Sequence, residues 1–308
     1  MSEAGPASES RRGVLLGLSA WVMWGFFPLY WPLLKPSGAV EILAHRIFWS
    51  MVVMLVVVVV MRRRAALRRA LADRRTRWLL AVASVLITVN WGAYIWGVNH
   101  DHVVEASLGY FINPLVSVLL GVLFLGERMR RLQWAALALA AVAVLGLTVE
   151  YGRPPWLALV LAFSFGSYGL VKKKADAGAV ESVVIETLVM SPVALGYIVV
   201  LTATGASTFG DHGVLHAVLV VGTALVTVVP LLCFAGAATR IPLSTLGLMQ
   251  YLTPTVQFVL GLVVFHEPMP AMRWVGFALI WLALVLFTAE TLRNRRRTLR
   301  VRPEEVPV

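Results

Sequence analysis

A few ionisable side chains stand inside long apolar stretches of this sequence, and they are the first candidates for chemistry. His45 and Arg46 lie in the run 40–61, and Glu105 lies near the start of the run 103–125. An ionisable side chain inside a membrane-spanning helix costs roughly 2.5–3.5 kcal/mol to insert, so it is a functional candidate by default. Arg46 and Glu105 stand at similar depth from the same side, which suggests an ion pair that works as an outer gate. A static pair that fixes packing is the open alternative.

The chain contains an internal repeat. The stretch 106–134 recurs without a gap at 246–274. The identical residues, each pair 140 positions apart, include Pro114 and Pro254, Gly121 and Gly261, Glu127 and Glu267, Met129 and Met269, and Trp134 and Trp274. Five matches in one register indicate a duplicated unit of about half the chain.

The repeat supplies a matching inner gate. The counterpart of Arg46 is Glu186, in the apolar run 181–202, and the counterpart of Glu105 is Thr245, close to Arg240. Glu186 paired with Arg240 or with Lys172 would close the opposite side, and its carboxyl group is the candidate for proton coupling. The alternative is a carboxylate wetted at the membrane edge, because Glu186 stands only about one and a half turns into its helix.

Uncharged polar and aromatic residues occupy the middle of the apolar runs, and they are the predicted substrate-binding residues. The polar members are Asn90, Asn113, Gln250 and Thr253, and the aromatic members are Trp24, Tyr94, Tyr110 and Tyr168. Amides read polar ligands by hydrogen bonds, and aromatic side chains wall ligand cavities. The alternatives are helix–helix hydrogen bonds, favoured for Gln257, and plain packing of the aromatic rings.

Two of these polar residues stand beside a proline. Pro114 follows Asn113, and Pro254 follows Thr253. Proline removes a backbone donor and frees the carbonyl one turn earlier. Broken helices at the membrane midplane are where many transporters bind substrate, so we expect a break at both prolines.

Composition places the chain in a membrane. Of its 308 residues 59% are hydrophobic and 14% are charged, whereas a soluble domain carries about 25% charged residues. Ten apolar runs are long enough to span: 13–34, 40–61, 78–98, 103–125, 132–150, 155–173, 181–202, 213–237, 243–265 and 271–291. Only helices satisfy their backbone groups inside such a segment, so the expected fold is an all-α integral membrane protein with ten transmembrane helices. The single Cys233 excludes a disulfide framework.

The basic residues predict the orientation. With a cytoplasmic N-terminus, 23 of the 27 Lys and Arg residues fall on the cytoplasmic side, three fall on the other side, and Arg46 lies within a span. This asymmetry predicts that both termini are cytoplasmic. The arginine-rich segment 62–77 is either a solvated topogenic loop or an amphipathic helix on anionic lipid. The net charge of +11 is explained by these loops, so no nucleic-acid partner is expected.

The halves 1–150 and 151–308 each hold five spans, and the second ends in a basic cytoplasmic tail. An odd number of spans inserts the second half upside down, which is the inverted-topology repeat of many secondary transporters.

Four strings carry a family resemblance: EILAHRIFWS (41–50), EASLGYFINPLVSVLLGVLFLGER (105–128), LAFSFGSYGLVKKK (161–174) and PLLCFAGAATRIPLSTLG (230–247). In these the chain resembles the RarD group of the EamA-type drug/metabolite transporter superfamily, whose members are commonly labelled chloramphenicol-sensitivity proteins. The resemblance implies two EamA repeats, helices 1–5 and 6–10, in a permease of the bacterial cytoplasmic membrane. It also implies export of amino acids, metabolites or drugs. It implies no particular binding residue.

The leading hypothesis is therefore a secondary transporter that uses alternating access at a midplane cavity formed by spans 1, 3, 4, 6, 8 and 9. A membrane-embedded enzyme or a channel is the alternative. We expect no catalytic residue, because no span carries a Ser-His pair or paired carboxylates, and no ATP hydrolysis, because no phosphate-binding loop is present. No cofactor or metal is expected. The expected partners are a small-molecule substrate and membrane lipid, with a homodimer left open.

Overall fold

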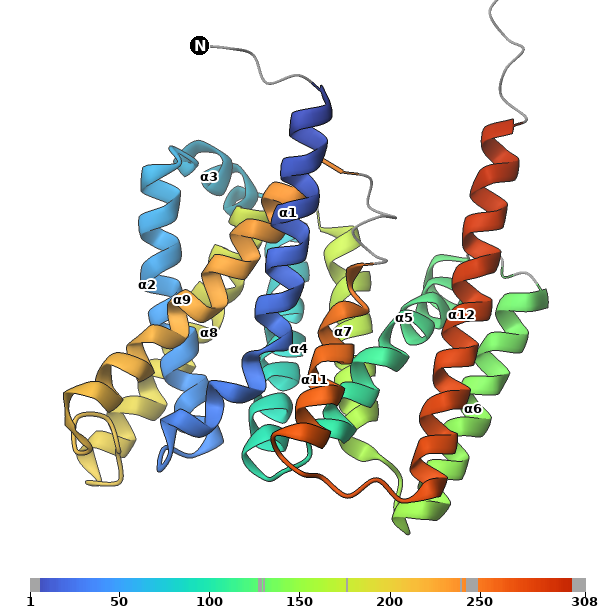
Figure 1. The fold of residues 1–308 in the computed structure, drawn as a ribbon. Coiled ribbons are helices and arrows are strands. Elements are labelled where there is room, and N and C mark those ends of the chain that lie inside the picture. Colours follow the sequence, from blue (N-terminus) through green and yellow to red (C-terminus); the bar gives the residue numbers. More distant parts are fainter. Residues whose placement is uncertain are drawn as a thin grey trace, which may run out of the picture.

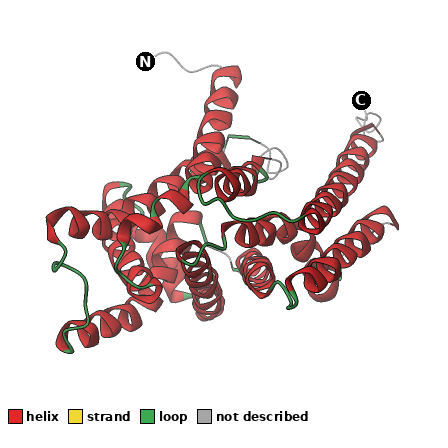
Figure 2. Ribbon diagram, turned by 60° about the horizontal axis from the view of Figure 1, so that its bottom comes forward, coloured by secondary structure: helices red, strands yellow, loops and turns green. Residues whose placement is uncertain are grey.

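The computed structural model describes residues 6–126, 129, 131–175, 177–238, 240, 241 and 249–300. In that part of the chain every regular element is a helix, and Figure 2 shows these helices joined by loops. The prediction of an all-α protein is confirmed. Thr245 and the beginning of the predicted span 243–265 lie outside the described residues.

The helices follow the predicted apolar runs closely. The first half forms α1 (Pro6–Gly25), the 3-10 helices η1 (Phe27–Leu29) and η2 (Trp31–Leu34), α2 (Ala39–Val60), α3 (Arg64–Ala72), α4 (Arg74–Asn99), α5 (Val103–Leu125) and α6 (Arg131–Tyr151). The second half forms α7 (Trp156–Lys174), α8 (Ala179–Ala203), α9 (Gly213–Ala238), α11 (Leu252–Val263) and α12 (Ala271–Arg300). The arginine-rich segment 62–77 thus contains a short helix, α3.

Among the described residues, seven helices are long and apolar enough to cross a membrane, and the bent pair of α1 with η1 and η2 raises the number to eight. The helix α7 ends in three lysines, and α11 has only 12 residues, so neither reaches the required apolar length. The protein is a multi-pass membrane protein. The full set of ten spans stays a prediction.

The prolines have different effects from those expected. A bend of 40° separates α1 from the 3-10 helices that contain Pro28 and Pro32. In contrast, α5 continues without interruption through Pro114, and Pro254 stands in the first turn of α11. A proline in the first turn of a helix removes no intrahelical hydrogen bond, so α11 accommodates Pro254 where it begins. Because α5 is continuous, the expected break at Pro114 is wrong.

Helices of one half pack mainly against helices of the other half, and most of these contacts occur in matched pairs. The contact of α5 with α7 has its counterpart in α11 with α1, that of α4 with α7 in α9 with α1, and that of α4 with α8 in α9 with α2. Figure 1 shows α6 and α12 side by side at one edge of the bundle, where they pack on each other.

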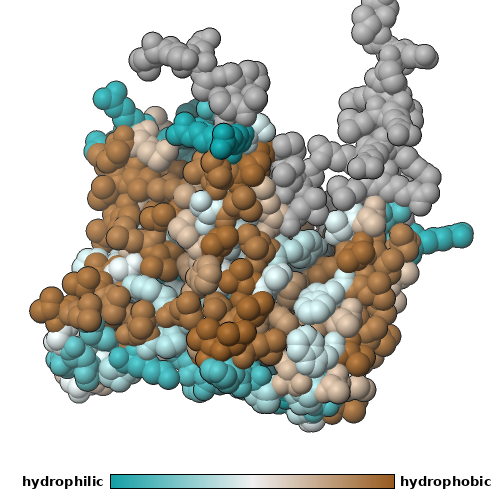
Figure 3. All heavy atoms as spheres, viewed as in Figure 1, coloured by the Kyte–Doolittle hydropathy of each residue, from teal (hydrophilic) through white to brown (hydrophobic). Residues whose placement is uncertain are grey.

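The surface separates into an apolar belt and two polar ends. Figure 3 shows a broad hydrophobic band across the helices, with hydrophilic residues gathered along the lower end and at parts of the upper end. Large apolar side chains such as Val56, Val142 and Leu145 are more than half exposed. We call the end with α3 and the start of α1 the upper face, and the end with the loop joining α4 to α5 the lower face (Figure 1). In the predicted orientation the upper face is cytoplasmic.

Candidate functional site

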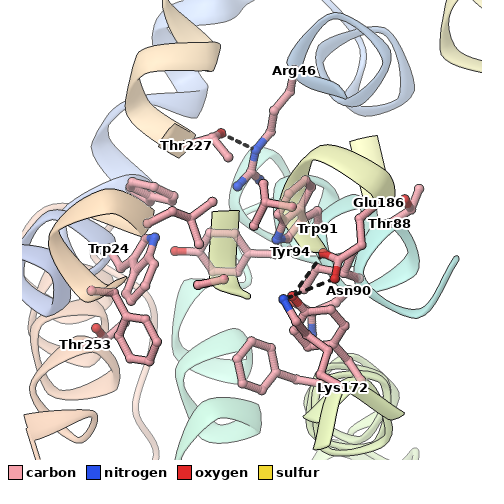
Figure 4. Close-up of a pocket in the computed structure, with 18 of the residues that line it drawn as sticks. Trp24, Arg46, Thr88, Asn90, Trp91, Tyr94, Lys172, Glu186, Thr227 and Thr253 are labelled. Carbon is pink, nitrogen blue, oxygen red and sulfur yellow. Dashed lines mark hydrogen bonds and ion pairs between the residues drawn. The ribbon is translucent and has the colours of Figure 1, made fainter. Parts of the chain in front are cut away.

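A cavity of about 320 Å³ lies inside the bundle. Its lining residues come from α1, η1, α2, α4, α5, α7, α8, α9, α11 and the residue Gln250 that precedes α11, whereas α6 and α12 contribute none. All eight predicted substrate-binding residues line this cavity: Trp24, Asn90, Tyr94, Tyr110, Asn113, Tyr168, Gln250 and Thr253. Figure 4 labels four of them, Trp24, Asn90, Tyr94 and Thr253, which come from α1, α4 and α11.

Aromatic rings form two walls of the cavity. On one side, Trp24 lies 4.9 Å from Trp21 and 5.9 Å from Phe234, measured between ring centroids. On the other side, Tyr110 lies 5.6 Å from Tyr94 and 6.4 Å from Phe165. Edge-to-face pairs at these separations are favourable contacts that orient the rings. The walls therefore offer preformed aromatic surface to an apolar ligand.

Several polar residues of the cavity also hold helices together. The amide nitrogen of Asn90 donates to the carbonyl oxygen of Leu161 and to the hydroxyl of Ser164 on α7, both at 3.0 Å. The hydroxyl of Thr253 donates to the carbonyl oxygen of Trp21 at 2.7 Å, and the amide of Gln257 donates to that of Trp24 at 3.1 Å. The two latter bonds join α11 to the end of α1. These bonds favour the packing interpretation for the donors of Asn90, Thr253 and Gln257.

Arg46 extends from α2 into the cavity (Figure 4). Its side chain is 3% exposed, and its Nε donates to the hydroxyl of Thr227 on α9 at 2.8 Å. The guanidinium carbon lies 4.0 Å from the ring centroid of Trp91. Cation–π contact of this kind is strongest where water is excluded. Arg46 is therefore fixed in place by α4 and α9.

Glu186 also reaches the cavity, and it belongs to a three-residue cluster. Its carboxylate lies 3.1 Å from Nζ of Lys172 and accepts a hydrogen bond from the hydroxyl of Tyr168 at 3.1 Å. Lys172 in turn donates to Tyr168 at 2.8 Å. Of the two predicted partners of Glu186, the structure places Lys172 in contact. Arg240 does not line the cavity and pairs instead with Glu9 at 2.9 Å.

The expected ion pair between Arg46 and Glu105 is wrong. Glu105 pairs with Arg153 at 2.9 Å, and its carboxylate also accepts the backbone N–H of Leu157 at 3.1 Å, in the first turn of α7. The cause is the close packing of α5 on α7, in which Gly109 approaches Ala158 so closely that a Cβ atom would lie 2.7 Å from its carbonyl oxygen. Glu105 therefore faces α7 and not α2.

The remaining predicted gating residue, His45, lies outside the cavity. Its ring stacks on Phe209 of the loop that joins α8 to α9, at 4.7 Å between centroids. Neither ring nitrogen has a hydrogen-bond partner within the described part of the chain. The same loop is held by Glu41, whose carboxylate accepts the backbone N–H of Thr208 at 2.8 Å.

Another carboxylate, that of Glu267, joins two segments of the chain at the lower face. Glu267, in the loop between α11 and α12, accepts the backbone N–H groups of Val103 and of Val104, the latter at 3.0 Å, at the beginning of α5. Burial raises the pKa of Glu267 to about 7, and the two N–H donors partly oppose this rise. The repeat singled out Glu267 as the counterpart of Glu127, but gave no indication of this contact with α5.

Sequence reasoning missed three cavity residues with hydroxyl groups, Thr88, Thr187 and Thr227. Threonines are common in membrane helices, and nothing in their sequence positions marked these three.

Comparison with known proteins identifies the family. The model of the EamA-like transporter family matches residues 11–149 and again residues 154–289. The chain belongs to this family of membrane transporters. Within it the chain falls in the RarD group, as the resemblance of its sequence motifs suggested. It is 57% identical to "Protein RarD" of Streptomyces exfoliatus, over 94% of this chain and 92% of the relative. It is also 44% identical to "Protein RarD" of Escherichia coli (strain K12), over 95% and 99% of the two chains.

A solved crystal structure shares the fold. It superimposes with a TM-score of 0.59 at 17% identity, over 91% of this chain and 98% of the other. At this identity the likeness concerns the fold alone.

Proposed function

We propose that this protein is a secondary transporter that exports small metabolites, amino acids or drugs across the bacterial cytoplasmic membrane. The observation that carries the proposal is the internal cavity. It lies within an apolar-surfaced helix bundle and is lined by aromatic and polar side chains from both halves of the chain. A cavity of this composition is typical of small-molecule sites.

Alternating access is the mechanism that we propose. The halves 1–150 and 151–308 act as two inverted five-helix repeats that rock around the cavity. The matched helix contacts between the two halves support this arrangement. When two related halves pack face to face, each contact between them occurs twice, the second time between the equivalent helices of the opposite halves. The cavity-lining helices include the six that the sequence predicted, and also α2 and α8, which bring in Arg46 and Glu186.

We place closure at carboxylate contacts on the two sides of the cavity. In the proposed orientation, with both termini cytoplasmic, the cluster of Glu186, Lys172 and Tyr168 joins α7 to α8 on the cytoplasmic half of the cavity. Glu186 is the proposed proton-coupling residue. On the opposite side, Glu105 with Arg153 and Glu267 with the start of α5 join the ends of helices from both halves.

Counterflow in proteoliposomes tests the proposed function. Purified protein is loaded with unlabelled compound and exposed to a labelled panel of amino acids, small metabolites and chloramphenicol, with and without an imposed pH gradient. We expect saturable counterflow of at least one compound, lost in Trp24→Leu, where the cavity wall is cut away. Trp78→Leu is the matched control, because Trp78 is 66% exposed on the surface of α4. Absence of counterflow for every compound by folded, inserted protein would contradict the proposal.

A further inference from the structure

Arg46 carries a positive charge that no described residue balances. No carboxylate of the described residues lies within ion-pair distance of its guanidinium, and within that part of the chain its hydrogen bond goes to Thr227. The hydroxyl of Thr227 in turn donates its proton to the carbonyl oxygen of Thr223 at 2.8 Å, so it acts toward Arg46 as an acceptor. The terminal nitrogens Nη1 and Nη2 thus make no hydrogen bond to the described residues, and neither nitrogen is fully buried. These donors are therefore open to the cavity.

The other charges near the cavity are already matched. Lys172 and Glu186 pair with each other at 3.1 Å. The buried carboxylates elsewhere have partners of their own. Glu41 accepts a hydrogen bond from Thr208, Glu105 pairs with Arg153, and Glu181 pairs with Arg63. The described cavity wall therefore carries one unbalanced positive charge. A buried charge without a partner is costly, so its presence indicates that a ligand supplies the counter-charge.

The geometry around Arg46 selects the type of anion. The rings of Trp91, Trp31 and Phe27 lie 4.0, 5.2 and 5.8 Å from the guanidinium carbon. Thr227 holds the Nε, which leaves the edge with Nη1 and Nη2 for a ligand. Two parallel N–H donors match the two oxygens of a carboxylate. The same cavity is walled by the aromatic rings of Tyr94, Tyr110 and Trp24.

We propose that Arg46 is the anion-binding residue of the transport site and that the substrate is a carboxylate with an apolar body of about the size of an aromatic ring. The carboxylate binds to Nη1 and Nη2, and the body lies against the rings. This inference rests on the proposed transport function and replaces a gating role for Arg46.

Two probes that differ only in charge test the inference. N-acetylphenylalanine carries a carboxylate, and its amide is neutral with the same body. Binding of each to the detergent-purified full chain is measured by titration calorimetry. We expect the carboxylate to bind about 10- to 100-fold more tightly than the amide, as for a hydrogen bond to a charged group. In Arg46→Gln this difference disappears, and in Arg46→Lys part of it remains, because the ammonium keeps the charge but loses the two-donor edge.

Arg273→Gln is the matched control. Arg273 also stacks on an aromatic ring, that of Tyr151 at 4.3 Å, but it lies outside the cavity. Its loss should leave the preference for the carboxylate unchanged. Thermal unfolding verifies that each variant is folded. If Arg46→Gln is not folded, Arg46→Lys provides the test.

Three results would overturn the inference: equal binding of the two probes, no binding of the carboxylate at 10 mM or so, or a carboxylate preference that persists in Arg46→Gln. Counterflow of the compound panel by the same preparation separates this failure from that of the proposed function. Saturable counterflow together with any of the three results refutes the anion site alone.

Discussion

The ion pair of Glu105 and Arg153 predicts an asymmetric response to mutation. The side chain of Glu105 is 3% exposed and that of Arg153 is 38% exposed. Arg153→Gln leaves a buried carboxylate with one N–H donor, that of Leu157, and no cation. Glu105→Gln leaves the guanidinium at the water-exposed edge, while the new amide oxygen still accepts from Leu157. Removing Arg153 should therefore destabilise the protein more than removing the charge of Glu105.

The magnitudes follow from burial. Breaking a fully buried pair by removing one partner costs about 3–5 kcal/mol, and an exposed pair contributes about 0–1 kcal/mol. For this half-exposed pair we expect Arg153→Gln to cost about 1–3 kcal/mol. Glu105→Gln should cost about 1 kcal/mol, the value of one hydrogen bond. The double variant should be more stable than Arg153→Gln alone, since no charge is left buried.

Thermal unfolding of the purified variants, followed by tryptophan fluorescence in one detergent, measures this order. Glu9→Gln serves as the control, because Glu9 is 41% exposed and its pair with Arg240 should contribute little. Equal midpoints for Arg153→Gln and Glu105→Gln, or strict additivity in the double variant, would refute the reasoning.

Three further predictions concern the loops, the packing and the coupling. Because the pKa of Glu267 is about 7 in the folded protein against 4.5 in the unfolded chain, its contribution to stability is present below pH 4.5 and is lost as pH rises through 7. Glu267→Gln should therefore remove a pH dependence of at most about 3 kcal/mol from the thermal stability in that window. Gly109→Ala should lower stability by about 1–3 kcal/mol, since the new methyl group meets the backbone of Ala158. Glu186→Gln should keep counterflow but lose the response of transport to an imposed pH gradient.

Each of these three has its own contradicting result. For Glu267, the contradicting result is a difference in thermal unfolding midpoint between Glu267→Gln and the parent protein that stays constant from about pH 4 to about pH 8. For Gly109, the matched control is Gly146→Ala in α6, where a Cβ atom meets nothing within 4 Å; equal midpoints for the two variants would contradict the close contact of α5 with α7. For Glu186, gradient-driven transport by the glutamine variant would exclude a proton-coupling role.

The depth of polar residues in the membrane could be read from the sequence. Asn113 and Thr253 were placed at matching depth by the repeat, and both line the cavity. Depth depends on local properties, namely the length of an apolar run and the rise of a helix. Those properties are present in the sequence itself, which is why the helices and the ring of cavity residues could be predicted.

The direction in which each helix faces could not be read in the same way. The sequence placed Glu105 and Arg46 at similar depth, but Glu105 lies in the first turn of α5 and Arg46 lies about two turns into α2. In addition, α5 turns Glu105 toward α7, because Gly109 allows these helices to touch. That rotation is set by packing between segments far apart in the sequence. The same limit explains the unexpected contact of Glu267 with the start of α5. Pro114 shows a third limit, since the sequence marks a missing donor but does not show that the helix continues around it.

The central claim is that one cavity is reached alternately from the two sides of the membrane, and cysteine accessibility tests it most directly. Cys233 is the one cysteine of the chain, so Cys233→Ala gives a background without thiols. Thr88→Cys then places a thiol at the cavity wall, and Val142→Cys, on the exposed surface of α6, serves as the lipid-facing control.

A membrane-impermeant maleimide is applied separately from each side, to spheroplasts and to inverted vesicles. We predict that Thr88→Cys is labelled from both sides, that a transported compound protects it on both, and that Val142→Cys is labelled from neither. Labelling of Thr88→Cys from one side only, whatever compound is present, would contradict alternating access.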